Sequence, residues 1–383
     1  MLQIILLLNP IYVTLLWALE LNINTDKSPP RTFLGKFMIN AFIMFVCYLL
    51  YYYPFDTYYY YYADNFLCLT LLLLFPLYYI YIRLLTVDKK FSLKKHFKYL
   101  ASSIIMFIIF TVSLYSISPK EHYDLAYNND IEINGRLLFY TIIENITRIF
   151  YLLHSIYFTI LSFIQIIRHK KSIQNYYANY EESRIKKIYT LNIAVSVSSV
   201  IFIIFSFLDK NFFIEKEHLF IIPSLIIMCM FFIIGLLGNN QHSAIIDPEA
   251  SSENIPSENI NPTQLETIKK KIEYLFEVDK IYLNKELNLW ELSRLINTNR
   301  TYITLLIGNY YNKNFSTFVN HYRLKHVENL LNKNPELTNE DLANLSGFGS
   351  VISMQRAFQN IEGKTISQIK KKIIRSKFDT NQE

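Results

Sequence analysis

The sequence predicts an all-α protein in which a seven-helix transmembrane bundle is followed by a separate, polar helical domain. Of the 383 residues, 51% are hydrophobic and only 18% are charged, a high ratio for a protein surrounded by water. Up to about Gly238 the apolar residues form long runs, whereas beyond it they recur every three or four positions among Lys, Glu and Asn. The two regions are therefore built for different solvents.

The apolar runs define the first domain, residues 1–238. A hydrocarbon core about 30 Å thick requires roughly 20 residues of helix. Seven runs reach that length, namely 2–21, 33–53, 65–85, 97–117, 137–167, 188–208 and 219–238. Because lipid cannot satisfy backbone polar groups, and because nothing here alternates as a barrel strand does, we expect seven transmembrane helices.

The placement of Lys and Arg predicts the orientation of these spans. The first, third and fifth loops and their flanks carry fifteen of these cations, whereas the alternate loops carry four. Short loops that retain Lys and Arg stay on the cytoplasmic side. We therefore expect a multi-pass protein of the inner, cytoplasmic membrane, with the amino terminus outside and the carboxy terminus in the cytoplasm.

Three ionisable residues within the fifth run are candidates for a functional role. Glu144 and Arg148 are four residues apart and share a helical face, so they can form an ion pair. Their run is longer than a bilayer requires, which favours a structural pair at the interface. His154 lies deeper, where a satisfied core histidine is the simpler interpretation. A functional role for these three residues stays open at this point.

The sequence gives no sign of catalysis. It contains no HExxH, GxSxG or GxxxxGK[ST] motif. Its three cysteines, Cys47, Cys68 and Cys229, lie inside apolar runs without CxxC spacing, which is typical of core or lipid-facing thiols. We therefore expect neither an enzyme nor a cofactor, and no catalytic or metal-binding residues.

Residues 239–262 are expected to form a flexible linker. This segment is rich in Ser, Asn, Glu and Pro and poor in large apolar residues. A flexible chain of roughly two dozen residues has a reach of about 25 to 30 Å. The domain that follows, residues 263–383, could therefore move away from the bilayer surface.

A helical period governs this last domain, which has a basic tail. The apolar positions predict two short helix pairs, separated by one long helix over residues 315–332. Residues that favour helix N-caps precede four of the helices, at Asn299, Asn314, Thr338 and Ser350. The second pair is joined at Gly347-Phe348, where glycine permits a tight turn. This spacing is that of a helix-turn-helix.

These segments resemble the DNA-binding domain of the AraC/XylS family. The resemblance covers about the last 110 residues, through LNLWELSRLINTNRTYITLLI, FVNHYRLKHVENLL and LTNEDLANLSGFGSVISMQRAFQNIEGKTISQ. It implies two helix-turn-helix units joined by a linker helix, as in bacterial transcription regulators. The chain departs from the family pattern at four positions, namely Leu305, where an Arg is usual, Asn312 (Gly), Met354 (an aromatic residue) and Ile366 (Pro).

DNA binding requires a helix that presents polar side chains to base edges, together with cations that neutralise phosphates. The predicted DNA-binding residues are Arg300, Thr301, Tyr302, Thr304 and Asn309 in the first recognition helix, and Ser350, Val351, Ser353, Gln355 and Arg356 in the second. Residues 263–383 contain eighteen Lys and Arg against thirteen Asp and Glu, a moderate basic excess. Arg323 and Arg356 are also candidates for salt bridges inside the domain, and the runs 269–271 and 370–372 for solvated or lipid-facing surfaces.

Two functions follow from this organisation. The first is a membrane-anchored transcription regulator whose spans sense a signal or ligand and alter the presentation or dimerisation of a domain that binds two successive major grooves. Its partners would be DNA, the lipid bilayer and, in a homodimer, a second copy of the chain. The second is a membrane receptor or scaffold whose helical tail docks a protein partner without binding DNA.

The cation asymmetry makes a prediction about topology. A reporter fused after Glu383 is expected to lie in the cytoplasm, and a reporter inserted near Asn128 is expected to lie outside the cell membrane. Paired reporters, one that requires export and one that requires retention, measure both positions. An exported carboxy-terminal reporter would contradict the predicted orientation.

Overall fold

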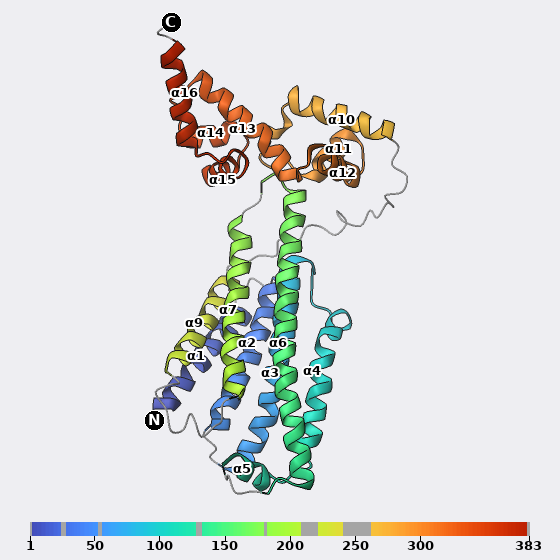
Figure 1. Cartoon of the computed structure of the whole chain (residues 1–383), viewed down its shortest axis with the longest axis vertical. Helices are drawn as coiled ribbons and strands as arrows, with labels where there is room; N and C mark the ends of the chain where they lie inside the picture. Colours follow the sequence, from blue (N-terminus) through green and yellow to red (C-terminus); the bar gives the residue numbers. More distant parts are fainter. Residues whose placement is uncertain are drawn as a thin grey trace. The chain divides into compact units, whose positions relative to one another are not determined.

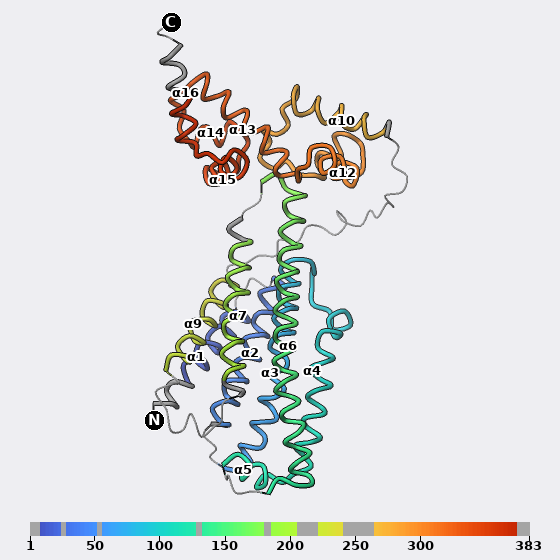
Figure 2. The backbone as a smooth tube through the Cα atoms, viewed as in Figure 1, coloured from blue at the N-terminus to red at the C-terminus, as the bar shows by residue number. Residues whose placement is uncertain are grey.

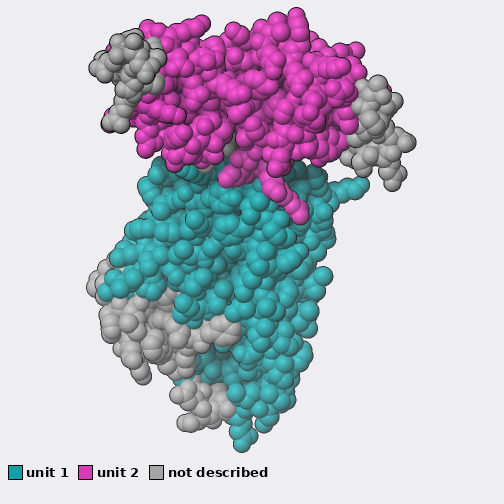
Figure 3. All heavy atoms as spheres, turned by 45° about the horizontal axis from the view of Figure 1, so that its top comes forward, with its two compact units in different colours: residues 1–167, 183–245 teal, residues 168–182, 246–383 magenta. Residues whose placement is uncertain are grey.

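The computed structural model describes residues 2–23, 28–52, 56–127, 132–179, 182–207, 221–239 and 262–380 (Figure 2). These residues form two compact units. Unit 1 comprises residues 1–167 and 183–245, and unit 2 comprises residues 168–182 and 246–383 (Figure 3). The predicted linker, 239–262, falls almost wholly outside the described residues. Unit 2 thus includes a short segment from between the fifth and sixth apolar runs.

All of the regular elements of unit 1 among the described residues are helices (Figure 1). They are α1 (Leu2–Ile23), α2 (Pro29–Tyr52), α3 (Thr57–Thr86), α4 (Leu93–Leu114), α5 (Pro119–Tyr127), α6 (Gly135–Tyr176), α7 (Glu182–Phe207) and α9 (Ile221–Asn239). Six of them, α2, α3, α4, α6, α7 and α9, are long and apolar enough to cross a membrane. The first predicted run forms the 22-residue helix α1, which is not among those six.

Two helices extend beyond the predicted runs. Helix α3 begins at Thr57, eight residues before the predicted start, because Tyr60 and Tyr61 are buried in the core and extend its apolar face. Helix α6 has 42 residues, which is about 63 Å of helix. This length is about twice the thickness of a hydrocarbon core. Its residues up to 167 belong to unit 1, and those from 168 onward belong to unit 2.

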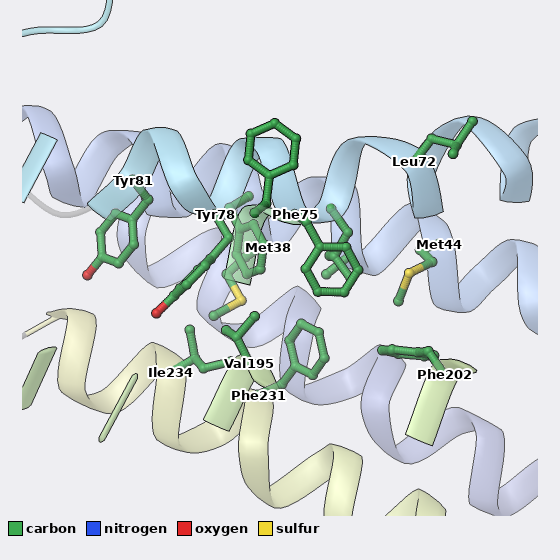
Figure 4. Packing of buried hydrophobic residues seen from close by; sticks show 14 of the residues in the cluster. Met38, Met44, Leu72, Phe75, Tyr78, Tyr81, Val195, Phe202, Phe231 and Ile234 are labelled. Carbon is green, nitrogen blue, oxygen red and sulfur yellow. The ribbon is translucent and has the colours of Figure 1, made fainter. Parts of the chain in front are cut away.

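The core of unit 1 is formed mainly by aromatic and aliphatic side chains of α2 and α3, with contributions from α1, α4, α6, α7 and α9. Figure 4 shows side chains from separate helices, among them Met38, Tyr78 and Phe231, packed in one cluster. Phe37 stacks on Phe231 with ring centroids 6.3 Å apart. Close approach also requires a small residue, because a Cβ at Gly235 would lie 2.3 Å from the Trp17 ring. Small residues at such contacts are typical of helix packing in membranes.

The outer surface of unit 1 is also apolar. Helix α4 exposes Ile105, Ile108, Ile109 and Val112, and α6 exposes Ile142, Ile146, Ile149, Leu153, Ile156, Ile160, Ile164 and Ile167. The three- and four-residue spacing places each set along one stripe of its helix. An exposed apolar surface of this extent is unfavourable in water. Its presence on helices of spanning length supports a multi-pass membrane protein.

The ionisable residues of the fifth run are paired within unit 1. The Arg148 guanidinium donates to the Glu144 carboxylate at 2.5 Å, which confirms the predicted pair on one helical face. His154 is buried, and its Nε2 lies 3.1 Å from the Ser102 hydroxyl. The histidine is therefore hydrogen-bonded inside the core.

The described residues of unit 2 form eight further helical elements. They are α10 (Pro262–Glu277), the 3₁₀ turn η4 (Ile281–Leu283), α11 (Leu289–Ile296), α12 (Arg300–Tyr311), α13 (Phe315–Lys333), α14 (Asn339–Leu345), α15 (Val351–Glu362) and α16 (Ile366–Thr380). The two short pairs, α11 with α12 and α14 with α15, lie on either side of α13 (Figure 1). This arrangement confirms the predicted order of two helix pairs and one long helix.

Helix α13 joins two separate hydrophobic cores. Its first half contributes Phe315, Phe318 and Val319 to a core shared with α10, α11 and α12. Its second half contributes Leu324 and Val327 to a core shared with α14, α15 and α16. Both helix pairs therefore bury apolar side chains against the same central helix, which makes α13 the structural link between the pairs.

Arg323 occupies the boundary between the two cores and is fully buried. Its Nε donates to the Tyr282 carbonyl at 2.7 Å, and its Nη2 donates to the Asn284 carbonyl at 2.8 Å. Burial lowers the pKa of Arg323 to about 9, which leaves the guanidinium charged at pH 7. The sequence predicted a salt bridge inside the domain for Arg323. Among the described residues its partners are instead carbonyl and amide oxygens inside the domain.

Gly347 lies in the turn between α14 and α15 and has a φ of +75°, a region that favours glycine. A Cβ there would lie 2.6 Å from the carbonyl oxygens of both Tyr282 and Leu283. These oxygens belong to the backbone and cannot move aside as a flexible side chain can. Gly347 therefore permits a close approach between the second helix pair and the η4 turn.

Replacing Gly347 with Ala is expected to destabilise unit 2 by about 2–4 kcal/mol, because it adds a steric clash to an unfavourable φ. Gly363→Ala is the matched control, because Gly363 also has a positive φ of +65°, whereas a Cβ there would meet nothing within 4 Å in the described residues beyond its chain neighbours. This change should lower the free energy of unfolding by about 1–2 kcal/mol. Thermal proteolysis of the full chain in detergent measures both. Equal losses for the two variants would contradict the packing role of Gly347.

Candidate nucleic-acid interface

The first helix pair is fixed by side-chain caps at its turns. Asn288 accepts from the Glu291 amide at 3.0 Å and begins α11, and Asn299 accepts from the Thr301 amide at 2.8 Å and begins α12. Between them Asn297 ends α11 with a φ of +57°, a conformation that asparagine tolerates better than most residues. The predicted cap at Asn299 is confirmed, whereas Asn288 was not predicted.

The second helix pair begins with two capping boxes. Thr338 accepts from the Asp341 amide at 3.1 Å while the Asp341 carboxylate accepts from the Thr338 amide. Ser350 and Ser353 form the equivalent pair at the start of α15. Reciprocal caps of this kind satisfy the orphan amides of a helix N-terminus. They fix the start of α14 at Thr338 and the start of α15 at Ser350, as predicted.

Asn312 and Asn314 set the entry into the linker helix. Asn312 has a φ of +50°, and Asn314 accepts from the Thr317 amide at 2.8 Å. The left-handed conformation at Asn312 explains why glycine is usual there in the resembling family, and why asparagine is an acceptable replacement. The predicted cap at Asn314 is confirmed.

The predicted DNA-binding residues differ in exposure. On α12, Thr304 and Asn309 are exposed, Thr301 and Tyr302 are half-buried, and Arg300 is buried at 9% exposure. At the second recognition helix, the α15 cap Ser350 and Gln355 are exposed. The other three, Val351, Ser353 and Arg356, are half-buried. The hydroxyl of Ser353 also donates to the Ser350 carbonyl at 2.7 Å. In this arrangement Arg300 is the least accessible of the ten.

A cavity of about 120 Å³ adjoins the second recognition helix. Its lining includes Ser353 and Arg356 of α15, and Asn314 and Thr317 at the start of α13. The lining also includes Gln174, in the last turn of α6, and Ala178 and Asn179, which follow that helix. The structure therefore brings two predicted DNA-binding residues together with a segment that the sequence did not associate with them.

Several of the domain's lysines are held by internal partners. Lys271 donates to the Ile296 carbonyl at 3.2 Å, Lys370 donates to the Leu337 carbonyl at 2.6 Å, and Lys269 bonds to the Tyr310 hydroxyl. Lys371 and Lys372 are exposed. Of the second predicted basic run, it is therefore Lys371 and Lys372 that are best placed to neutralise phosphate.

Comparison with known proteins agrees with this geometry. Residues 292–372 match the helix-turn-helix domain family, of the AraC type, and this span runs from α11 into α16. The carboxy-terminal region is an AraC-type helix-turn-helix DNA-binding domain. No curated protein and no solved structure gives a significant match to the chain. The matched span includes α12 and α15, the two helices that the sequence predicted as recognition helices, and the long helix α13 between the two pairs.

Arg356→Ala is expected to weaken binding to a selected duplex more than binding to a scrambled one, by about 1–3 kcal/mol, if the guanidinium reads a base edge. The double change Lys371→Ala and Lys372→Ala should weaken both duplexes similarly and flatten the salt dependence by roughly one unit per lost phosphate contact. Titrations of the full chain at several salt concentrations separate these effects. Equal losses on both duplexes for Arg356→Ala would assign that residue a phosphate or structural role.

Proposed function

We propose that this chain is a membrane-anchored, sequence-specific transcription regulator that reads two successive major grooves from the cytoplasmic side. The observation that carries the proposal is the combination, in one chain, of an AraC-type DNA-binding domain with six helices of membrane-spanning length. Because α13 holds both recognition helices on separate cores, their sites on DNA should lie about 10 to 10.5 base pairs apart.

The proposed orientation takes α1 as a seventh span. Helix α1 has 22 residues and packs against α2 and α9 within unit 1. An odd number of spans places the two termini on opposite sides of the membrane. With the cations concentrated in alternate loops, this arrangement puts the amino terminus outside and the DNA-binding domain in the cytoplasm.

A buried polar cluster in unit 1 supports a sensory role for the membrane part. His122 of α5 is buried, and its Nε2 lies 3.1 Å from a carboxylate oxygen of Asp64 on α3. The Tyr140 hydroxyl of α6 donates to the same oxygen at 3.3 Å. Ionisable groups in membrane helices are costly and usually functional. The sequence did not single out this cluster, which joins α6 to the helices around it.

Binding of the full chain to DNA tests the proposal. Protein in lipid nanodiscs should retain a subset of genomic fragments, with an affinity that falls steeply as salt rises. Empty nanodiscs and a chain carrying the Lys371→Ala and Lys372→Ala changes are the controls. Failure to retain any fragment at low salt would contradict the regulator and favour a receptor or scaffold whose tail docks a protein.

A further inference from the structure

Residues 174–179 belong to unit 2 and lie beside its second recognition helix. Gln174, Ala178 and Asn179 line the same cavity as Ser353 and Arg356. A Cβ built on Gly349, one residue before the α15 cap, would lie 3.7 Å from the side-chain amide of Asn179. The segment therefore lies beside the part of α15 that carries the predicted DNA-binding residues Ser353 and Arg356.

The backbone of this segment is built into the first helix pair. Ala178 donates its amide to the Leu287 carbonyl at 3.2 Å, and Tyr177 forms an antiparallel bridge with Asn288. The Ser316 hydroxyl donates to the Ala178 carbonyl at 3.0 Å. Ala178 is only 1% exposed and belongs to the core around α12. These contacts hold the segment at the start of both α11 and α13.

The Asn179 side chain connects the two helix pairs. Its Nδ2 donates to the Lys285 carbonyl at 2.7 Å and to the Gly347 carbonyl at 3.2 Å. Its Oδ1 accepts from Arg323 Nη1 at 2.8 Å. One amide thus uses three hydrogen bonds to join the η4 region, the linker helix and the turn before α15.

We propose that residues 174–179 form an autoinhibitory element, so that docking of this segment and binding of DNA exclude one another. The inference rests on the proposed DNA-binding function. The major groove is about 12 Å wide, and a helix with its side chains is about 10–12 Å across. The groove therefore has no room for a second peptide along the face of α15 that carries Ser353 and Arg356.

The competition is steric and not electrostatic. The last turns of α6 carry Arg168, Lys170 and Lys171, so the segment does not imitate the negative charge of DNA. Its contacts with the rest of unit 2 are apolar burial, hydrogen bonds to backbone carbonyl groups, and hydrogen bonds accepted from Ser316 and Arg323. Docking should therefore change little with salt, whereas DNA binding weakens as salt rises.

The segment also provides a covalent route from the membrane part to the DNA-binding domain. Residues 135–176 are one continuous helix, and residues up to 167 belong to unit 1. A displacement of α6 by one turn, about 5.4 Å, would break every hydrogen bond of Ala178 and Asn179. A signal that moves α6 would in this way uncover the recognition surface.

A disulfide between residues 179 and 349 tests the proposal. The Cβ positions of Asn179 and Gly349 are 3.9 Å apart, which is a suitable separation for a disulfide. Asn179→Cys and Gly349→Cys are combined in the full chain, in a Cys229→Ser background, because Cys229 is the exposed native cysteine. The probe is a duplex selected from a random library by the reduced protein in nanodiscs.

The oxidised double variant is expected to bind this duplex at least about tenfold more weakly than the same protein after reduction, because only the undocked fraction is competent. The two single-cysteine variants should show no redox dependence. A disulfide that forms without changing affinity, or one that fails to form, overturns the proposal. Absence of binding by every form overturns the proposed function as well.

A pair of charge variants tests release of the segment without cysteines. Ala178→Glu places a carboxylate in a buried site and should undock the segment, so the full chain binds the duplex more tightly than wild type, by up to about tenfold. Ser172→Glu is the matched control, because Ser172 is exposed on α6 two residues before the segment, so the change adds the same charge without undocking. Equal affinities for the two variants overturn the proposal.

Discussion

The buried guanidinium of Arg323 is the interaction on which the arrangement of unit 2 depends. Its charge is removed from water, and an isolated buried charge costs several kcal/mol unless polar partners compensate for it. The compensating groups come from three places, the Tyr282 and Asn284 carbonyls and the Asn179 side chain. The guanidinium also faces the Phe348 ring at 5.7 Å. The two carbonyls hold the η4 turn against the linker helix, and Asn179 adds the α6 segment, whose release would leave both carbonyl contacts in place.

This constraint explains how two small cores behave as one domain. Neither helix pair has a large apolar interface with the other, because each packs on its own half of α13. Polar contacts connect the two pairs directly. One of them is the hydrogen bond that Lys285 Nζ donates to Asn344 Oδ1 at 2.8 Å. Gly347 allows the second turn to approach the Tyr282 carbonyl closely enough for these contacts. The spacing of the recognition helices therefore depends on polar groups at one junction.

Much of the fold follows from local patterns in the sequence. Apolar runs of about 20 residues predict spans because backbone groups must be satisfied inside lipid. Asn299, Asn314, Thr338 and Ser350 predict helix starts because a cap acts within three residues of itself. Asn312 replaces a glycine that the AraC pattern would contain, and it does so in a left-handed conformation. Each of these signals is read from a few neighbouring residues.

The docked segment could not be predicted in the same way. Asn179 bonds to residues 106 to 168 positions away, and nothing in the sequence Tyr-Ala-Asn distinguishes it from any polar loop. The predicted end of the fifth run at residue 167 marks where lipid-compatible sequence stops, whereas the helix itself continues to Tyr176. The Asp64, His122 and Tyr140 cluster was missed for the same reason, since three separate helices contribute to it. A polar contact between residues far apart in the sequence leaves no periodic pattern in the neighbouring residues, so it cannot be predicted from them.

The link between Arg323 and the α6 segment is tested most directly by hydrogen exchange of the full chain in nanodiscs, with and without a bound duplex. The Ala178 amide is hydrogen-bonded to Leu287, so peptides that cover residues 176–179 should exchange slowly in the free protein. Binding of DNA should make them exchange faster, while peptides from the core of α13 stay protected. Equal protection of residues 176–179 in the free and DNA-bound protein would contradict the account.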